Sequence, residues 1–193
     1  MQLLKKVLNF SAERHLKTAG DLFIYHSDYH GALALVEKAI ALDPADTRAL
    51  VLYGDILFCL NRDIDALQAL NKALSLNSTL AEAYISKAGV LEVMGKYREA
   101  LQCCKLALAN IDHKKQYLLF SLLDQKLILL IRLKRYREAQ QVLENAVNYL
   151  EEDELEYLYG SYKGILDQFC QKRSQAREKA KTLSLHVLEG TFN

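Results

Sequence analysis

The chain has 193 residues, of which 51% are hydrophobic and 25% charged, and its formal net charge is +1. This composition is that of an ordinary globular protein, and a chain of this length can bury enough surface to fold without a disulfide or a bound metal. The near-neutral charge argues against nucleic acid as a partner, because nucleic-acid binding rests on clustered basic residues. One proline, eight glycines and the lack of alternating β-branched runs predict an all-α fold with short loops.

The cysteines and the apolar segments bear on the compartment. Four cysteines stand at Cys59, Cys103, Cys104 and Cys170, without any C-x-x-C spacing. Each lies in an apolar helical pattern, so we expect buried free thiols and a reducing compartment. The first ten residues do not resemble a signal peptide, and the most apolar run, 117–133, is too short and too charged to span a membrane. The sequence predicts a cytoplasmic protein with no cofactor.

Residues 1–12 form a short amphipathic segment, with apolar residues on one side and Lys5 and Lys6 on the other. We expect this segment to cap the exposed core of the helices that follow, because the end of a repeat array needs a cover. Folding back onto a binding surface and contact with a membrane are the two alternatives.

A repeat begins at Leu16. Residues 16–44 contain two amphipathic helical patterns, and the same pattern returns 34 residues later and again after another 34. A constant period of this size is the signature of a stacked helical repeat. The recurring small positions are Gly20, Gly54 and Ala88; Ala32, Ala66 and Ala100; and Ala39, Ala73 and Ala107.

The spacing has a physical cause. Small residues on facing helices let the two backbones approach closely, and Leu16, Leu50 and Tyr84 would fill the space beside them. Pro44 ends the second helix of the first repeat because it has no amide hydrogen.

The turns also carry signals. Ser27 or Asp28 can cap the second helix of the first repeat, and 61–63 offers a similar cap in the second repeat. In the third repeat, Gly95 suits the left-handed backbone conformation that often ends a helix. Asn77 and Asn110 are weaker helix stops.

The fourth repeat breaks the period. Its Y-R-E-A sequence at 136–139 follows the same sequence at 97–100 by 39 residues, which predicts a longer first helix or loop. The helix over 117–133 is apolar on nearly every face, so we expect burial on more than one side. Either the C-terminal helices cover it, or a second copy does, which would give a homodimer through 117–133 or through the C-terminal helices.

The last part of the chain, 152–193, is a degenerate fifth pair that ends in a polar cap. Acids crowd 151–156, where a helix begins, and bases follow at its far end, an order that complements the helix dipole. Gly160 and Gly164 lie four residues apart, which predicts close packing.

These residues resemble the tetratricopeptide repeat (TPR) family. The resemblance implies a right-handed superhelical α-solenoid of antiparallel helix pairs, about four pairs plus capping helices. It places the repeats at 13–46, 47–80, 81–114 and 115–151, after the segment 1–12 and before the region 152–193.

The resemblance also implies a partner-binding groove on the inner face of the first helix of each pair. The side chains that it assigns there are Lys17, Asp21, Ile24 and Tyr25; Val51, Asp55, Phe58 and Cys59; Ile85, Gly89, Glu92 and Val93; and Asp124, Ile128, Ile131 and Arg132. This face would be apolar with a line of acids, which suits a helix or peptide carrying apolar and basic residues. The alternative is that the protein's own termini cover it.

A carboxylate clamp, the best-known binding mode of the family, does not fit. Only Lys17 matches the five clamp positions, since Asp21, Leu52, Glu82 and Ser86 stand at the other four. Acids at two of these places would repel an anionic ligand, and the clamp arginine is missing.

The sequence predicts a non-catalytic scaffold or adaptor that binds a partner protein. It carries no phosphate loop, no H-E-x-x-H motif and no nucleophile elbow. His26 and His30 have a metal-ligand spacing, but a turn lies between them, so we expect no metal site. The alternatives are a secretion-type TPR chaperone for an export substrate and a self-associating structural TPR protein.

Overall fold

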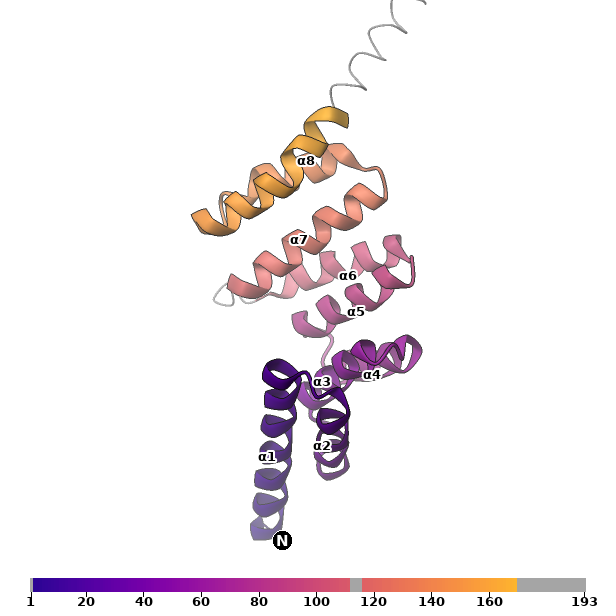
Figure 1. The fold of residues 1–193 in the computed structure, drawn as a ribbon. Coiled ribbons are helices and arrows are strands. Elements are labelled where there is room, and N and C mark those ends of the chain that lie inside the picture. Colours follow the sequence, from indigo (N-terminus) through magenta and orange to yellow (C-terminus); the bar gives the residue numbers. More distant parts are fainter. Residues whose placement is uncertain (1, 112–115, 170–193) are drawn as a thin grey trace, which may run out of the picture. The chain divides into compact units, whose positions relative to one another are not determined.

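The computed structural model describes residues 2–111 and 116–169, and every regular element in these ranges is a helix (Figure 1). The helices are α1 (Gln2–His26), α2 (Tyr29–Leu42), α3 (Thr47–Cys59), α4 (Asp63–Leu76), α5 (Ala81–Val93), α6 (Tyr97–Asn110), α7 (Gln116–Arg132) and α8 (Tyr136–Ala146). A further helix covers 152–169. The prediction of an all-α fold is confirmed. The chain divides into two compact units between Leu118 and Leu119, which are described separately.

The first unit repeats a helical hairpin. α3 and α5 begin 34 residues apart, and so do α4 and α6. Within each hairpin α1 packs on α2, α3 on α4 and α5 on α6. Successive hairpins meet through α2 with α3 and α4 with α5, and the first helices α1, α3 and α5 also contact their neighbours. The 34-residue period of the sequence is therefore a period of structure.

α1 is one continuous helix. The amphipathic pattern predicts an element boundary near residue 12, whereas the helix runs without interruption from Gln2 to His26. The physical reason is that no glycine or proline lies between Gln2 and Ala19, so nothing interrupts the backbone hydrogen bonds. Ala12 is buried, as expected for a residue that faces another helix.

The hairpin turns share one backbone conformation. Asn61, Gly95 and Lys134 each follow a first helix and have positive φ values of 58°, 74° and 57°. The next residue then closes the helix end, as where the Arg135 amide donates a 2.8 Å hydrogen bond to the Leu130 carbonyl. The expectation for Gly95 is confirmed.

The helix caps follow the sequence only in part. Asp28 caps α2, because its carboxylate accepts a 2.9 Å hydrogen bond from the Gly31 amide. The N-cap position of α4 is Arg62, which makes no side-chain cap, so no residue of 61–63 caps this helix. Asn61 is used instead for its tolerance of positive φ.

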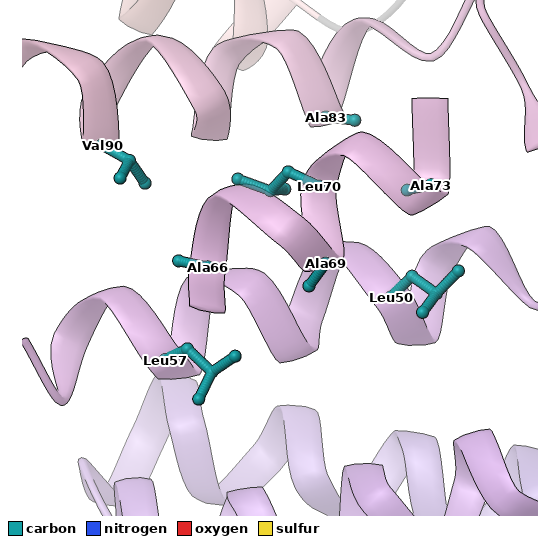
Figure 2. Packing of buried hydrophobic residues seen from close by; sticks show 8 residues of the cluster. All are labelled: Leu50, Leu57, Ala66, Ala69, Leu70, Ala73, Ala83 and Val90. Carbon is teal, nitrogen blue, oxygen red and sulfur yellow. The ribbon is translucent and has the colours of Figure 1, made fainter. Parts of the chain in front are cut away.

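Close packing centres on Gly54. A Cβ atom there would lie 2.8 Å from Leu70 Cγ and 3.4 Å from the Ala66 carbonyl oxygen, so α3 and α4 meet at backbone distance. Leu70 and Ala66 belong to a buried cluster drawn from α3, α4 and α5, shown in Figure 2 as Leu50, Leu57, Ala66, Ala69, Leu70, Ala73, Ala83 and Val90.

The sequence also predicts that α1 packs closely on α2 at Gly20, and this prediction is wrong. A Cβ atom there would meet nothing within 4 Å. The fully buried small residue of α1 is its neighbour Ala19, which packs with Ala32 of α2. Successive residues of a helix point about 100° apart, so when Ala19 faces α2 its neighbour Gly20 faces away from it.

In the second unit the helix over 152–169 lies against α7 and α8. The ring centroids of Phe120 and Tyr157 are 5.7 Å apart, and those of Tyr136 and Phe169 are stacked at 4.1 Å. The apolar surface of α7 is thus covered at least in part by this chain's own helix. The prediction of close packing at Gly160 and Gly164 is wrong for the described residues, since a Cβ atom at either position would meet nothing within 4 Å.

Candidate partner-binding surface

The candidate surface is the exposed side of α1, α3 and α5. On each helix the assigned residues follow an i, i+4, i+7, i+8 spacing, which places them along one side of a helix. Because α3 contacts both α1 and α5, the three sides are neighbours. We call this surface the first-helix face and define it by Lys17, Asp21, Ile24, Tyr25, Val51, Asp55, Phe58, Cys59, Ile85, Gly89, Glu92 and Val93.

α1 contributes the most accessible part of the first-helix face. Lys17, Asp21, Ile24 and Tyr25 are all exposed, and Tyr25 keeps 76% of its surface. Ile24 and Tyr25 are therefore large apolar side chains that stand in water near the end of α1 and do not belong to the core.

Sequence reasoning missed one residue that continues this surface. Phe10 is 74% exposed, and it lies seven residues before Lys17 and fourteen before Ile24, so it shares their side of α1. The heptad spacing was visible in the sequence. Phe10 falls outside the predicted surface because the predicted boundary after residue 12 separates it from the rest of α1.

α3 contributes side chains that belong partly to the core. Val51 and Phe58 are half-buried and pack against the cluster around Leu57 and Leu70. Cys59, at the end of α3, is exposed. A truncation of Phe58 would therefore change stability as well as any surface contact, because core contacts would be lost.

Asp55 is the charged group at the centre of α3. Its side chain is partly buried, and the Ser86 side chain on α5 donates a hydrogen bond to it. Burial raises the pKa of the Asp55 carboxyl to about 6, and the hydrogen bond from Ser86 only partly offsets this effect. Asp55 forms no ion pair with a lysine or arginine of the described residues. Among the described residues, the Asp55 carboxylate is therefore stabilised by the neutral Ser86 hydroxyl and not by a cation.

α5 completes the first unit's part of the surface. Ile85, Gly89 and Glu92 are partly buried, and Val93 is 67% exposed at the helix end. The accessible apolar residues therefore lie on the two outer helices, while Val51 and Phe58 on α3 are recessed.

Four predicted residues, Asp124, Ile128, Ile131 and Arg132, lie in the second unit, where Ile131 is partly buried and Arg132 is exposed. Asp124 and Ile128 of α7 are partly buried, and Asp124 accepts a 2.6 Å hydrogen bond from the Tyr162 hydroxyl. Asp124 is thus engaged by the chain's own helix 152–169.

Over 2–111 and 116–169, no group of three or more His, Cys, Asp or Glu side chains could hold a metal. His26 ends α1 and His30 lies in α2, so the pair is split between two helices. No helix in the described part of the chain is long and apolar enough to cross a membrane.

The comparisons with known proteins agree with the repeat. The family model for subunit 3 of the anaphase-promoting complex, or cyclosome, matches residues 26–107, from the end of α1 into α6. No curated protein matches the chain.

Several solved structures share the fold. PilF of Pseudomonas aeruginosa superposes with a TM-score of 0.68 at 15% identity, over 87% of this chain and 77% of that one. The second TPR of Spaghetti (RPAP3), bound to the HSP90 peptide SRMEEVD, superposes with a TM-score of 0.52 at 17% identity, over 56% of this chain and 98% of that one. The secretion chaperone SycD of Yersinia enterocolitica, in complex with a peptide of the translocator YopD, superposes with a TM-score of 0.56 at 16% identity, over 62% of this chain and 92% of that one.

At these identities the likenesses establish the fold. Together with the repeated hairpins and their 34-residue period, they lead to one conclusion. The chain has an all-α solenoid fold similar to that of tetratricopeptide-repeat structures.

Proposed function

We propose that this protein is a non-catalytic scaffold whose first-helix face binds a helix or extended segment of a partner protein. The observation that carries the proposal is the exposure of Tyr25 and Val93 on the two outer helices of this face, 76% and 67% respectively. Exposed apolar side chains that share one surface mark a contact site. An amphipathic segment would cover them by the same groove-binding mode that many peptide receptors use.

Two of the similar structures support this function by analogy. The RPAP3 repeat and SycD are each bound to a peptide of another protein. In this chain the partner segment would place apolar anchors near the recessed or exposed apolar residues of the face, namely Ile24, Tyr25, Val51, Phe58, Ile85 and Val93. Basic residues of the segment would meet Asp55 and Glu92.

The test uses residues that can be changed at little cost to the core. A displayed library of random peptides is selected on the wild-type protein and on the double variant Tyr25→Ala, Val93→Ala. We expect the wild type to enrich amphipathic peptides and the double variant to bind them at least about tenfold more weakly, equivalent to about 1.4 kcal/mol.

The matched control is Ile64→Ala with Leu76→Ala. These two side chains of α4 are also large, apolar and exposed, but they lie outside the first-helix face. The control should bind the selected peptides as the wild type does. Equal losses in both double variants, or no enrichment on the wild type, would rule the proposal out.

A secretion-type chaperone is the second candidate, because SycD shares the fold and carries a translocator peptide. It would use the same face. Protection of a purified export substrate from aggregation, lost in the Tyr25→Ala, Val93→Ala variant, would distinguish a chaperone from a passive adaptor.

A further inference from the structure

The centre of the first-helix face combines a carboxylate and a hydroxyl from two successive repeats. Asp55 stands in the middle of α3, one turn after Val51 and one turn before Cys59. Ser86 reaches it from α5 and donates a hydrogen bond. The two groups come from helices that pack directly on each other, so their positions are set by the core below them and not by a loop.

Unlike Asp46 and Asp65, Asp55 has no cation beside it among the described residues. Asp46 is 2.9 Å from Arg48 and Asp65 is 2.7 Å from Arg62, and both arginine side chains are exposed. Asp55 is partly buried, and its hydrogen-bond partner within the described ranges is the neutral Ser86 side chain. A partly buried carboxylate without a counter-charge is costly, and a cation that reached it would form a strong charge-assisted bond.

The surroundings suit a long basic side chain. Val51 and Phe58 offer apolar surface on the same helix. Lysine and arginine lay their aliphatic stems along such surface and extend the charged group to a carboxylate. An acidic segment would find no described cation at this point and would be repelled by Asp55.

Resting on the proposed function, we propose that Asp55 and Ser86 form a receptor for one lysine or arginine side chain of the bound segment. The stem of that side chain lies over Val51 and Phe58, and its head pairs with the Asp55 carboxylate. Asp55 therefore determines specificity, selecting basic and apolar segments over acidic ones.

The experiment repeats the displayed-library selection on the wild type, on Asp55→Asn and on the matched control Asp167→Asn. Asp167 is exposed on helix 152–169, and its replacement removes the same charge outside the face. Wild type and control should enrich lysine or arginine at one position of the selected peptides, between apolar positions. Asp55→Asn should lose that basic preference and keep the apolar positions.

A synthetic peptide from the wild-type selection then measures the pairing. Replacement of its basic residue by norleucine should weaken binding to the wild type about tenfold or more and should change binding to Asp55→Asn little. The HSP90 peptide SRMEEVD serves as the acidic probe, and we expect it to bind at least about tenfold more weakly than the selected peptide.

A second variant supplies the cation from within the chain. Ser86→Arg would place a guanidinium beside Asp55, so it should abolish the basic preference while circular dichroism shows a folded helical protein. This variant keeps the proposal testable if Asp55→Asn changes the fold.

The outcomes separate the two proposals. Selected peptides that need Tyr25 and Val93 but show no basic position would overturn the receptor and leave the scaffold function standing. The same basic position on wild type and on Asp55→Asn would also overturn the receptor. No enrichment on the wild type would overturn the scaffold function itself.

Discussion

The Tyr162 hydroxyl donates a 2.6 Å hydrogen bond to the carboxylate of Asp124, although the two residues lie 38 positions apart. The bond joins helix 152–169 to α7 within the second unit. It also engages inside the chain an acid that the repeat pattern assigns to a partner-binding groove. The acids at the assigned positions therefore have different surroundings, since Asp55 in the first unit accepts its hydrogen bond from the Ser86 side chain.

We expect Tyr162→Phe to lower the free energy of unfolding by about 1 to 3 kcal/mol, because it leaves a partly buried carboxylate without this donor. Chemical denaturation followed by circular dichroism measures the change. The control is Tyr157→Phe, which keeps the ring contact with Phe120 and removes a hydroxyl that has no hydrogen bond among the described residues. Equal effects of the two substitutions would show that the bond to Asp124 contributes nothing.

Asp55→Asn should stabilise the fold above about pH 6. The pKa of Asp55 is about 6 in the folded protein against the ordinary 3.8 of an aspartate side chain, so the folded state holds the proton more tightly and the wild type loses stability as the pH rises through this window. The gain of the variant should approach about 1 to 3 kcal/mol at pH 7.5 and vanish near pH 4. Because the side chain keeps some contact with water, we expect the lower part of this range.

Denaturation curves at pH 4, 6 and 7.5 test this pH dependence. Asp21→Asn, an exposed acid on α1, is the matched control and should change stability by less than about 0.5 kcal/mol. A gain for Asp55→Asn that does not depend on pH would contradict the assigned cause.

Gly54 and Gly20 occupy the same repeat position and should respond in opposite directions to alanine. Gly54→Ala would force a Cβ atom to 2.8 Å from Leu70 Cγ, and we expect a loss of about 1 to 3 kcal/mol. Gly20→Ala meets nothing within 4 Å and should gain about 0.5 to 1 kcal/mol from helix propensity. Thermal unfolding of the two variants side by side is sufficient, and a loss at both positions would show that α1 packs more closely than described.

The turn after α7 offers a stabilising change. Lys134 has a φ of 57°, which costs a side chain about 1 kcal/mol and glycine very little. Lys134→Gly should therefore raise the free energy of unfolding by about 0.5 to 1 kcal/mol, whereas Lys134→Ala should not. The reverse change in the third repeat, Gly95→Ala, should lower stability by a similar amount. If Lys134→Gly and Lys134→Ala behave alike, backbone conformation is not the cause.

The fold could be predicted because its determinants are local and repeated. The period of Ala32, Ala66 and Ala100 and the stop at Pro44 are readable along the chain, and the hairpins follow from them. The sequence could not predict whether Gly20 or Ala19 is the residue of α1 that packs against α2. It depends on the rotation of α1 against α2, which is set by all their contacts together.

The candidate site was predictable only in outline. Helical spacing placed Tyr25 and Val93 on the exposed side of their helices, but it could not show that Phe58 is recessed into the core cluster. Nor could it show that Ser86 would meet Asp55 or that Tyr162 would meet Asp124, because each pairing depends on how separate helices dock. The binding role of these residues remains a prediction.

Cys59 provides a thiol on the first-helix face that can be labelled chemically. It is the exposed thiol among the described cysteines, whereas Cys103 and Cys104 are buried. Burial and then the charge of Asp55 raise the pKa of the Cys59 thiol, so alkylation will be efficient only in mildly alkaline buffer. In a Cys170→Ser background, the rate at which an alkylating reagent labels Cys59 would report directly how much of the time this surface is covered.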